Sequence, residues 1–207
     1  MMGKFTGEFR TAPWLPENAI ALLDQLIQPD WKIIETGSGA STIWFAKRAS
    51  SVLSFEHKTE WAEIVMRKLG ETIGSNPDYL VAYDPEYPTH GIEKHLGIFP
   101  HIKPLFDLAL IDGRGRVRSI ETAMPYIRPG GWIVLDNANR PRYEKAHQIL
   151  AAEGWKTTAL QGLIMPEKKR GFTQFWRKPS GMAGKQSIKM RVRISEPQTD
   201  PGEGKGT

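Results

Sequence analysis

The residues best placed to do chemistry lie where an apolar run leads into a glycine-rich turn, and a second apolar run ends in an acid. The turn reads ETGSGAS over residues 35–41. Gly37 and Gly39 let a ligand approach the main chain, and a helix beginning near Ser41 offers unpaired N–H groups. Glu56 lies 56 − 37 = 19 residues after the first glycine, where an acid commonly accepts hydrogen bonds from ribose hydroxyls. The pattern indicates a site for a ligand that contains a ribose.

The type of ligand follows from what the turn lacks. A dinucleotide site would have glycine at position 42, which is Thr42, and the Gly-Lys-Ser/Thr sequence of a P-loop is missing. Glu35 precedes the turn and would repel a pyrophosphate, whereas it suits a ligand with an ammonium group. S-adenosylmethionine has an amino group, a sulfonium and a ribose, and no phosphate. The alternative is a tight strand-to-helix connection without a ligand, which would not need the acids Glu35 and Glu56.

Over residues 14–177 the chain resembles the class I S-adenosylmethionine-dependent methyltransferases. The resemblance rests on the glycine-rich turn, on Glu56, on Asp112 and on the segment RPGGWIVLDN at residues 128–137. It implies an α/β fold, Rossmann-like and doubly wound, with a mostly parallel seven-stranded sheet and an antiparallel edge strand. It also implies S-adenosylmethionine as cofactor, bound by Glu35, Gly37, Ser38, Gly39, Ser41, Glu56 and Asp112.

A second resemblance concerns the ends of the fourth and fifth predicted strands. Asp112 and the pair Asp136-Asn137 resemble the metal triad of the catechol and caffeoyl-coenzyme A O-methyltransferases, and their oxygens suit Mg²⁺. That subgroup carries a lysine three residues after the first acid, and this chain has Gly115 there. The alternative is that Asp112 faces the cofactor as the catalytic residue, while the other two cap a loop and form a turn.

The methyl acceptor is predicted to be a small molecule, methylated on oxygen. Five arginines follow the two strand ends and either bind a carboxylate or phosphate of an anionic acceptor or form a solvated rim. A nucleic-acid acceptor is disfavoured, because the tail from residue 178 carries 6 − 3 = +3 of the net charge of +5, which leaves +2 for the body. A protein acceptor and a non-catalytic cofactor-binding protein are the remaining alternatives. The five arginines are Arg114, Arg116, Arg118, Arg140 and Arg142.

The elements that position these residues alternate along the chain, which predicts a parallel sheet with helices on both faces and a final antiparallel hairpin. In such sheets the ligand lies beyond the carboxyl ends of the strands. A long loop is predicted at residues 84–103, and Trp14 is predicted to lie in the core or over the cofactor. The predicted helices are residues 14–27, 41–48, 59–73, 117–127 and 143–153, and the predicted strands are residues 31–35, 52–56, 79–83, 106–112, 132–136, 155–160 and 172–177.

The 207 residues suit one domain, predicted at residues 1–178, with an N-terminal cap-helix region at 1–30 and a disordered basic tail at 179–207. The chain has no cysteine, which excludes a disulfide framework, a zinc-thiolate site and a cysteine nucleophile. No apolar stretch approaches the ~18 residues of a membrane span, and the N-terminus lacks the apolar region of a signal peptide. We therefore expect a cytoplasmic protein that does not bind membranes.

Overall fold

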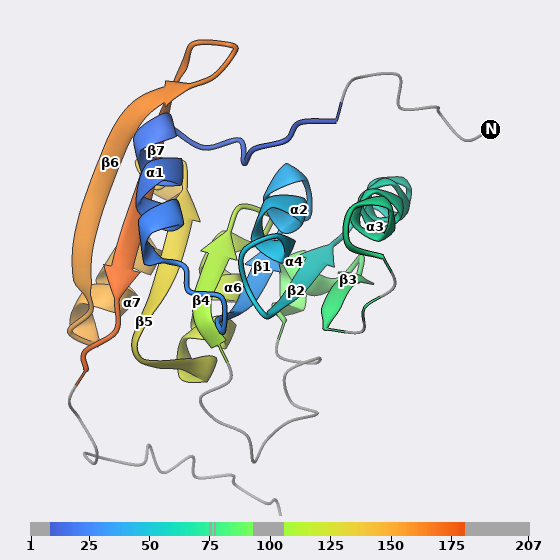
Figure 1. Cartoon of the computed structure of the whole chain (residues 1–207). Helices are drawn as coiled ribbons and strands as arrows, with labels where there is room; N and C mark the ends of the chain where they lie inside the picture. The colour runs from blue at the N-terminus through green and yellow to red at the C-terminus, as the bar shows by residue number, and fades with distance from the viewer. Residues whose placement is uncertain (1–8, 75, 77, 93–105, 181–207) are drawn as a thin grey trace, which may run out of the picture.

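A computed structural model describes residues 9–74, 76, 78–92 and 106–180. It contains a seven-stranded sheet in the order β3-β2-β1-β4-β5-β7-β6 (Figure 1), which confirms the predicted Rossmann-like α/β fold. The strands are β1 (Lys32–Thr36), β2 (Ser51–Glu56), β3 (Tyr79–Tyr83), β4 (Phe106–Ile111), β5 (Ile127–Asp136), β6 (Lys156–Ile164) and β7 (Lys169–Arg177). The helices are α1 (Glu17–Leu26), α2 (Ala40–Ala46), α3 (Thr59–Ile73), α4 (Tyr87–His90), α6 (Arg116–Ala123) and α7 (Glu144–Ala152), with short 3-10 helices η1 (Met124–Tyr126) and η2 (Pro141–Tyr143).

The central strands are buried on both faces, which explains why they are nearly continuous apolar runs in the sequence. In β4, Leu108 and Leu110 pack in the layer with α1, α2 and α3. Ala109 and Ile111 point the opposite way and pack in the layer with α4, α6 and α7. Strands β1 to β5 pair in parallel, so their carboxyl ends meet at one edge, where the predicted site residues are expected to lie.

The last two strands form the predicted antiparallel hairpin. β7 pairs antiparallel with both β5 and β6. The β6–β7 pair is antiparallel because residues 165–168 are too few for the crossover that a parallel pair would need. Both strands extend into the segment predicted as a loop at residues 161–171. Gly162 and Gly171 lie opposite each other in the ladder, and a Cβ at either would come within 3.2 Å of Pro16. They allow the start of α1 to approach the hairpin.

Other element boundaries differ from the prediction at proline and glycine residues. α1 begins at Glu17, after Pro16, rather than at residue 14. Trp14 therefore precedes the helix and is 51% exposed, which makes its predicted place in the core wrong. β5 begins at Ile127 rather than at residue 132, and α4 forms inside the predicted long loop. The rest of that loop, residues 93–103, and the predicted tail from residue 181 lie outside the described residues.

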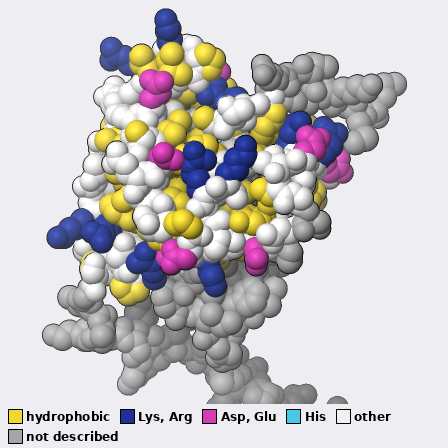
Figure 2. Space-filling model, in the orientation of Figure 1, with side chains coloured by type: hydrophobic (Ala, Val, Ile, Leu, Met, Phe, Trp, Pro, Cys, Tyr) yellow, Lys and Arg dark blue, Asp and Glu magenta, His cyan; other side chains and the backbone are white. Residues whose placement is uncertain are grey.

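We call residues 9–16 the strap, because they run past the hairpin turn and α2 before α1 begins (Figure 1). Acidic, basic and hydrophobic side chains are interspersed on the face that Figure 2 shows. Among the described helices, none is both long and apolar enough to cross a membrane.

Candidate active site

The glycine-rich turn is held against the turn that follows β4. Gly37 has a φ of 89°, and a Cβ there would lie 2.6 Å from the Gly113 nitrogen. The Gly113 N–H donates to the Thr36 carbonyl at 2.7 Å. A side chain at residue 37 is therefore excluded by both conformation and space. Gly39 differs, because its Cβ would meet only a Trp61 ring carbon, at 4.0 Å.

Glu35 lies beneath the turn, fully buried. Its carboxylate accepts hydrogen bonds from Thr42 at 2.5 Å, from Ser54 at 2.6 Å and from the Ser41 hydroxyl. Burial raises the pKa of Glu35 to about 7, against the opposing effect of the three hydroxyls. The acid thus ties β1 to α2 and β2 and supports the turn, and its predicted contact with a cofactor amino group stays a prediction.

The larger cavity at the carboxyl ends of the strands, the rim cavity, has a volume of about 880 Å³, within the ~300–1,000 Å³ of small-molecule sites. Glu56 lines it, at the end of β2. Glu56 Oε1 accepts hydrogen bonds from the His57 and Lys58 N–H groups at 2.8 and 2.9 Å. These bonds fix the carboxylate, and no hydrogen bond from a described residue reaches Oε2, the oxygen that a ribose hydroxyl could contact.

A second cavity of about 380 Å³, the strap cavity, lies on the other side of the turn. It is lined by Gly39 and Ser41 of the motif, by strap residues and by Glu167 of the hairpin turn. The two cavities share Gly37, Ser38, Trp61 and Asp112. Trp61 is fixed there because its indole N–H donates to the Ser38 carbonyl at 2.7 Å.

Arg116, which is almost fully buried, joins the ends of β4 and β5. Its Nη2 donates to Asp112 Oδ1 at 2.7 Å, and its Nε donates to the Gly113 carbonyl at 2.9 Å. Its Nη1 donates to the Asp136 carbonyl and lies 3.9 Å from Asp136 Oδ2. Burial and the neighbouring Asp136 raise the pKa of Asp112, and the Arg116 guanidinium opposes that rise. One fixed cation therefore lies between two acids.

This arrangement does not fit the predicted magnesium site. A divalent ion between Asp112 and Asp136 would meet the guanidinium of Arg116, which cannot be deprotonated in proteins. Asn137 lines a third cavity of about 220 Å³ instead of the two that contain Asp112. The Asp112–Asp136–Asn137 metal triad is therefore not supported.

The structure separates the five predicted arginines. Four of them line the rim cavity, and Arg140 lines the third cavity. Of the four, Arg116 forms ion pairs with Asp112 and Asp136. Arg118 Nη1 lies 3.5 Å from Glu121 Oε2. Arg114 and Arg142 have no carboxylate partner among the residues described. The four are Arg114, Arg116, Arg118 and Arg142.

Several site residues carry no motif and escaped the sequence analysis. Tyr87 accepts a hydrogen bond from the Arg114 N–H at 3.3 Å and holds the turn after β4. The sequence analysis placed Trp61 only within a predicted helix at residues 59–73, and Arg10 and Glu167 gave no local signal. The signal that could have indicated Trp61 is its position, since it is the single aromatic residue of α3 and follows Glu56 by five residues (61 − 56 = 5).

No protein-family model matches the chain. A release factor glutamine methyltransferase from Xylella fastidiosa (strain 9a5c) is 28% identical over 124 residues, which are 58% of this chain. The chain spans 42% of the length of that relative.

Solved structures cover more of the chain. An O-methyltransferase from Bacillus cereus, in complex with S-adenosylhomocysteine, has 26% identity and a TM-score of 0.58, covering 76% of this chain and 78% of that one. An rRNA methylase from Streptococcus thermophilus has 12% identity and a TM-score of 0.56, covering 77% and 93%. The second likeness is one of fold.

The raised pKa of Glu35 predicts a dependence of stability on pH. Since the unfolded carboxyl ionises near its ordinary value of 4.5 and the folded one near 7, the unfolded state binds fewer protons between these values. The free energy of unfolding should therefore fall by roughly 3 kcal/mol as pH rises through this window. Glu35→Gln should lack this contribution, whereas the raised pKa of Asp112 acts in both proteins, so chemical denaturation of both proteins from pH 4.5 to 8 should give diverging profiles. Parallel profiles would contradict the assignment.

Proposed function

We propose that this chain, which has the fold of the class I S-adenosylmethionine-dependent methyltransferases, transfers a methyl group from S-adenosylmethionine to an oxygen of a small anionic acceptor. The observation that carries the proposal is the junction of two cavities at Gly37, Ser38 and Asp112, with Glu56 at one side. The methyltransferase relatives in sequence and structure support the reaction class.

The cofactor residues proposed are those of the motif and the two acids at the strand ends. Glu56 accepts hydrogen bonds from the ribose, Gly37 and Ser38 approach the sulfur region, and Asp112 faces the sulfonium. When bound, the cofactor supplies an electrophilic methyl group. The acceptor oxygen attacks that methyl, the sulfur–methyl bond breaks, and S-adenosylhomocysteine and a proton are released. The protein therefore has to align donor and acceptor and exclude water.

An anionic acceptor is supported by the lining of the rim cavity beyond Asp112. Arg114 and Arg142 offer planar donor forks that suit a carboxylate or phosphate. A nucleic-acid acceptor has less support, because the residues after β4 read DGRGR rather than the Asn/Asp-Pro-Pro-Tyr pattern that acts on base amines. The rRNA methylase likeness concerns the fold, so RNA remains an outcome that the acceptor experiment tests.

Binding of the cofactor is tested by calorimetric titration with S-adenosylmethionine. We expect a micromolar-range dissociation constant for the wild type. Gly39→Arg should weaken binding by at least about 100-fold, or ~3 kcal/mol, because its side chain enters the strap cavity. Gly39→Ala is the matched control, since its Cβ meets no atom closer than 4.0 Å. Absence of binding by the folded wild type would reject the proposed function.

The acceptor class is tested with methyl-labelled S-adenosylmethionine in a cell extract, fractionated by size and by charge. We expect label in small anionic molecules. The double variant Arg114→Gln/Arg142→Gln should lose most of this label and still bind S-adenosylhomocysteine. Arg67→Gln, an exposed arginine of α3, is the control. Label in RNA or protein would contradict the small-molecule assignment.

Metal independence follows from the position of Arg116. Methyl transfer should be unchanged by EDTA, and millimolar MgCl₂ should not shift the melting temperature of the wild type. Arg116→Ala should lose about 3 kcal/mol of stability, because it leaves the buried Asp136 and the partly exposed Asp112 without their cation. MgCl₂ should restore part of that loss, since the two acids then face each other unpaired. Loss of wild-type activity in EDTA and its return with Mg²⁺ would overturn this assignment.

A further inference from the structure

We propose that the strap cavity holds the amino-acid end of the cofactor, and that Arg10 binds its carboxylate in exchange for Glu167. The inference rests on the proposed function, because it concerns the same cofactor. It adds residues from the strap and the hairpin turn, two segments that lie outside the glycine-rich motif.

The positions of the two cavities indicate which end of the cofactor lies in which cavity. Glu56 lines the rim cavity and not the strap cavity, whereas both cavities include Gly37, Ser38 and Asp112. S-adenosylmethionine is elongated, with the adenine at one end, the ribose in the middle and the amino acid at the other end. A molecule whose ribose contacts Glu56 therefore reaches the strap cavity by crossing the glycine-rich turn.

Charge favours placing the amino-acid end in the strap cavity rather than in the part of the rim cavity beyond Asp112. The amino-acid end carries an ammonium and a carboxylate, next to the sulfonium. Beyond Asp112 the rim cavity is lined by Arg114, Arg118 and Arg142, which repel the two cationic groups. The strap cavity offers one guanidinium, Arg10, together with the carboxyl groups of Asp112 and Glu167. Once the ligand carboxylate has replaced Glu167 on Arg10, Arg10 faces that carboxylate and Asp112 faces the cationic groups.

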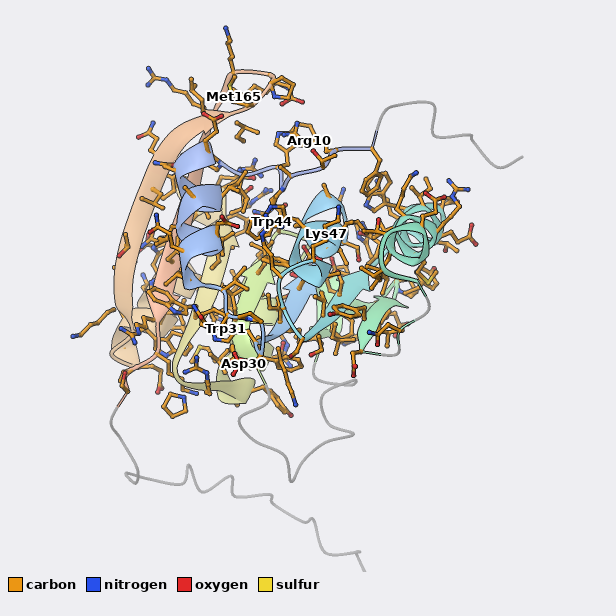
Figure 3. The ribbon with its side chains drawn as sticks, viewed as in Figure 1. Arg10, Asp30, Trp31, Trp44, Lys47 and Met165 are labelled. Atoms are coloured by element: carbon orange, nitrogen blue, oxygen red, sulfur yellow. The ribbon has the colours of Figure 1, made fainter. Side chains whose placement is uncertain are left out.

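The guanidinium of Arg10 is already arranged to recognise a carboxylate. Its Nη1 lies 2.6 and 2.8 Å from the two Glu167 carboxylate oxygens, and its Nη2 donates to the Met165 carbonyl. Figure 3 shows Arg10 beside Met165 at the hairpin turn. Arg10 lowers the pKa of Glu167, so Glu167 is an anion at neutral pH. The Glu167 carboxylate therefore occupies the position on Arg10 that a ligand carboxylate would take.

Exchange of the two carboxylates costs little because the pair is solvent-accessible. The Arg10 and Glu167 side chains are 24% and 33% exposed, and ion pairs of this kind add little to stability. A cofactor held at its adenosine end presents its carboxylate at a high effective concentration. It can therefore displace Glu167, whose own carboxylate moves into solvent.

Aromatic residues complete the walls of the strap cavity. Phe9 stacks on Trp61 with ring centroids 6.0 Å apart, which docks the strap on a residue of the shared junction. The Arg10 guanidinium lies 5.3 Å from the Trp14 ring centroid. The exposed face of Trp14 is thus part of a ligand-facing surface, and the methylene groups of the amino-acid end can pack there.

The experiment compares two probes by calorimetric titration of the full chain. S-adenosylhomocysteine contains the amino-acid end, and 5′-methylthioadenosine lacks it. Arg10→Met should weaken S-adenosylhomocysteine binding by about 10-fold or more and change 5′-methylthioadenosine binding by less than about 2-fold. Glu167→Gln should strengthen S-adenosylhomocysteine binding by a few-fold, because it removes the competing carboxylate, and leave the other probe unchanged.

Arg48→Met is the matched control, since Arg48 forms an exposed pair with Asp24 at 2.8 Å and lines neither cavity. It should leave both affinities unchanged. An Arg10→Met variant that binds both probes as the wild type does, or weakens both equally, would overturn the inference. Failure of the wild type to bind either probe would instead reject the proposed function.

Discussion

The site depends on a contact between two stretches of backbone. The turns after β1 and β4 touch at Gly37 and Gly113, where a Cβ on Gly37 would lie 2.6 Å from the facing nitrogen. This contact keeps the space above the two central strands free of side chains. It therefore produces the junction at which the two cavities meet, and any ligand that spans them must pass over main chain. The acids Glu56 and Asp112 are placed around that opening by the strands that end there.

Electrostatics explains why the acids at the ends of β4 and β5 do not form a metal site. Two neighbouring acids, the buried Asp136 and the partly exposed Asp112, need a positive charge nearby, and a divalent ion or an arginine can supply it. In this chain the first turn of α6 supplies Arg116, which also binds three backbone carbonyls and so fixes the turns after β4 and β5. The acids thus have an internal counter-ion, and their role is to position the site around it.

The sequence was informative where a residue's role is local and less so where it depends on distant segments. The alternation of apolar runs predicted the sheet and its hairpin, and the turn chemistry predicted the places of Gly37 and Glu56. Counting residues after Asp112 suggested that Gly115 replaced a lysine, but only the structure shows Arg116 turning back between the acids. The pair of Arg10 and Glu167 joins residues 157 positions apart, and no local pattern encodes such a contact. The extension of β6 and β7 over residues 161–171 was also missed, because the space at Gly162 and Gly171 is filled by the start of α1.

The strand order has a consequence for how the chain assembles. β7 is the last strand in the sequence, but it lies between β5 and β6 in the sheet. An interior strand of the sheet is therefore the last one to be synthesised. Until residues 169–177 have been synthesised, β5 presents an unpaired edge, and β6 has no neighbour to join. Such an edge is a template for association with other chains. A nascent chain on the ribosome therefore carries an open sheet until its last strand is inserted, and shielding of that edge by a chaperone would matter most at this stage.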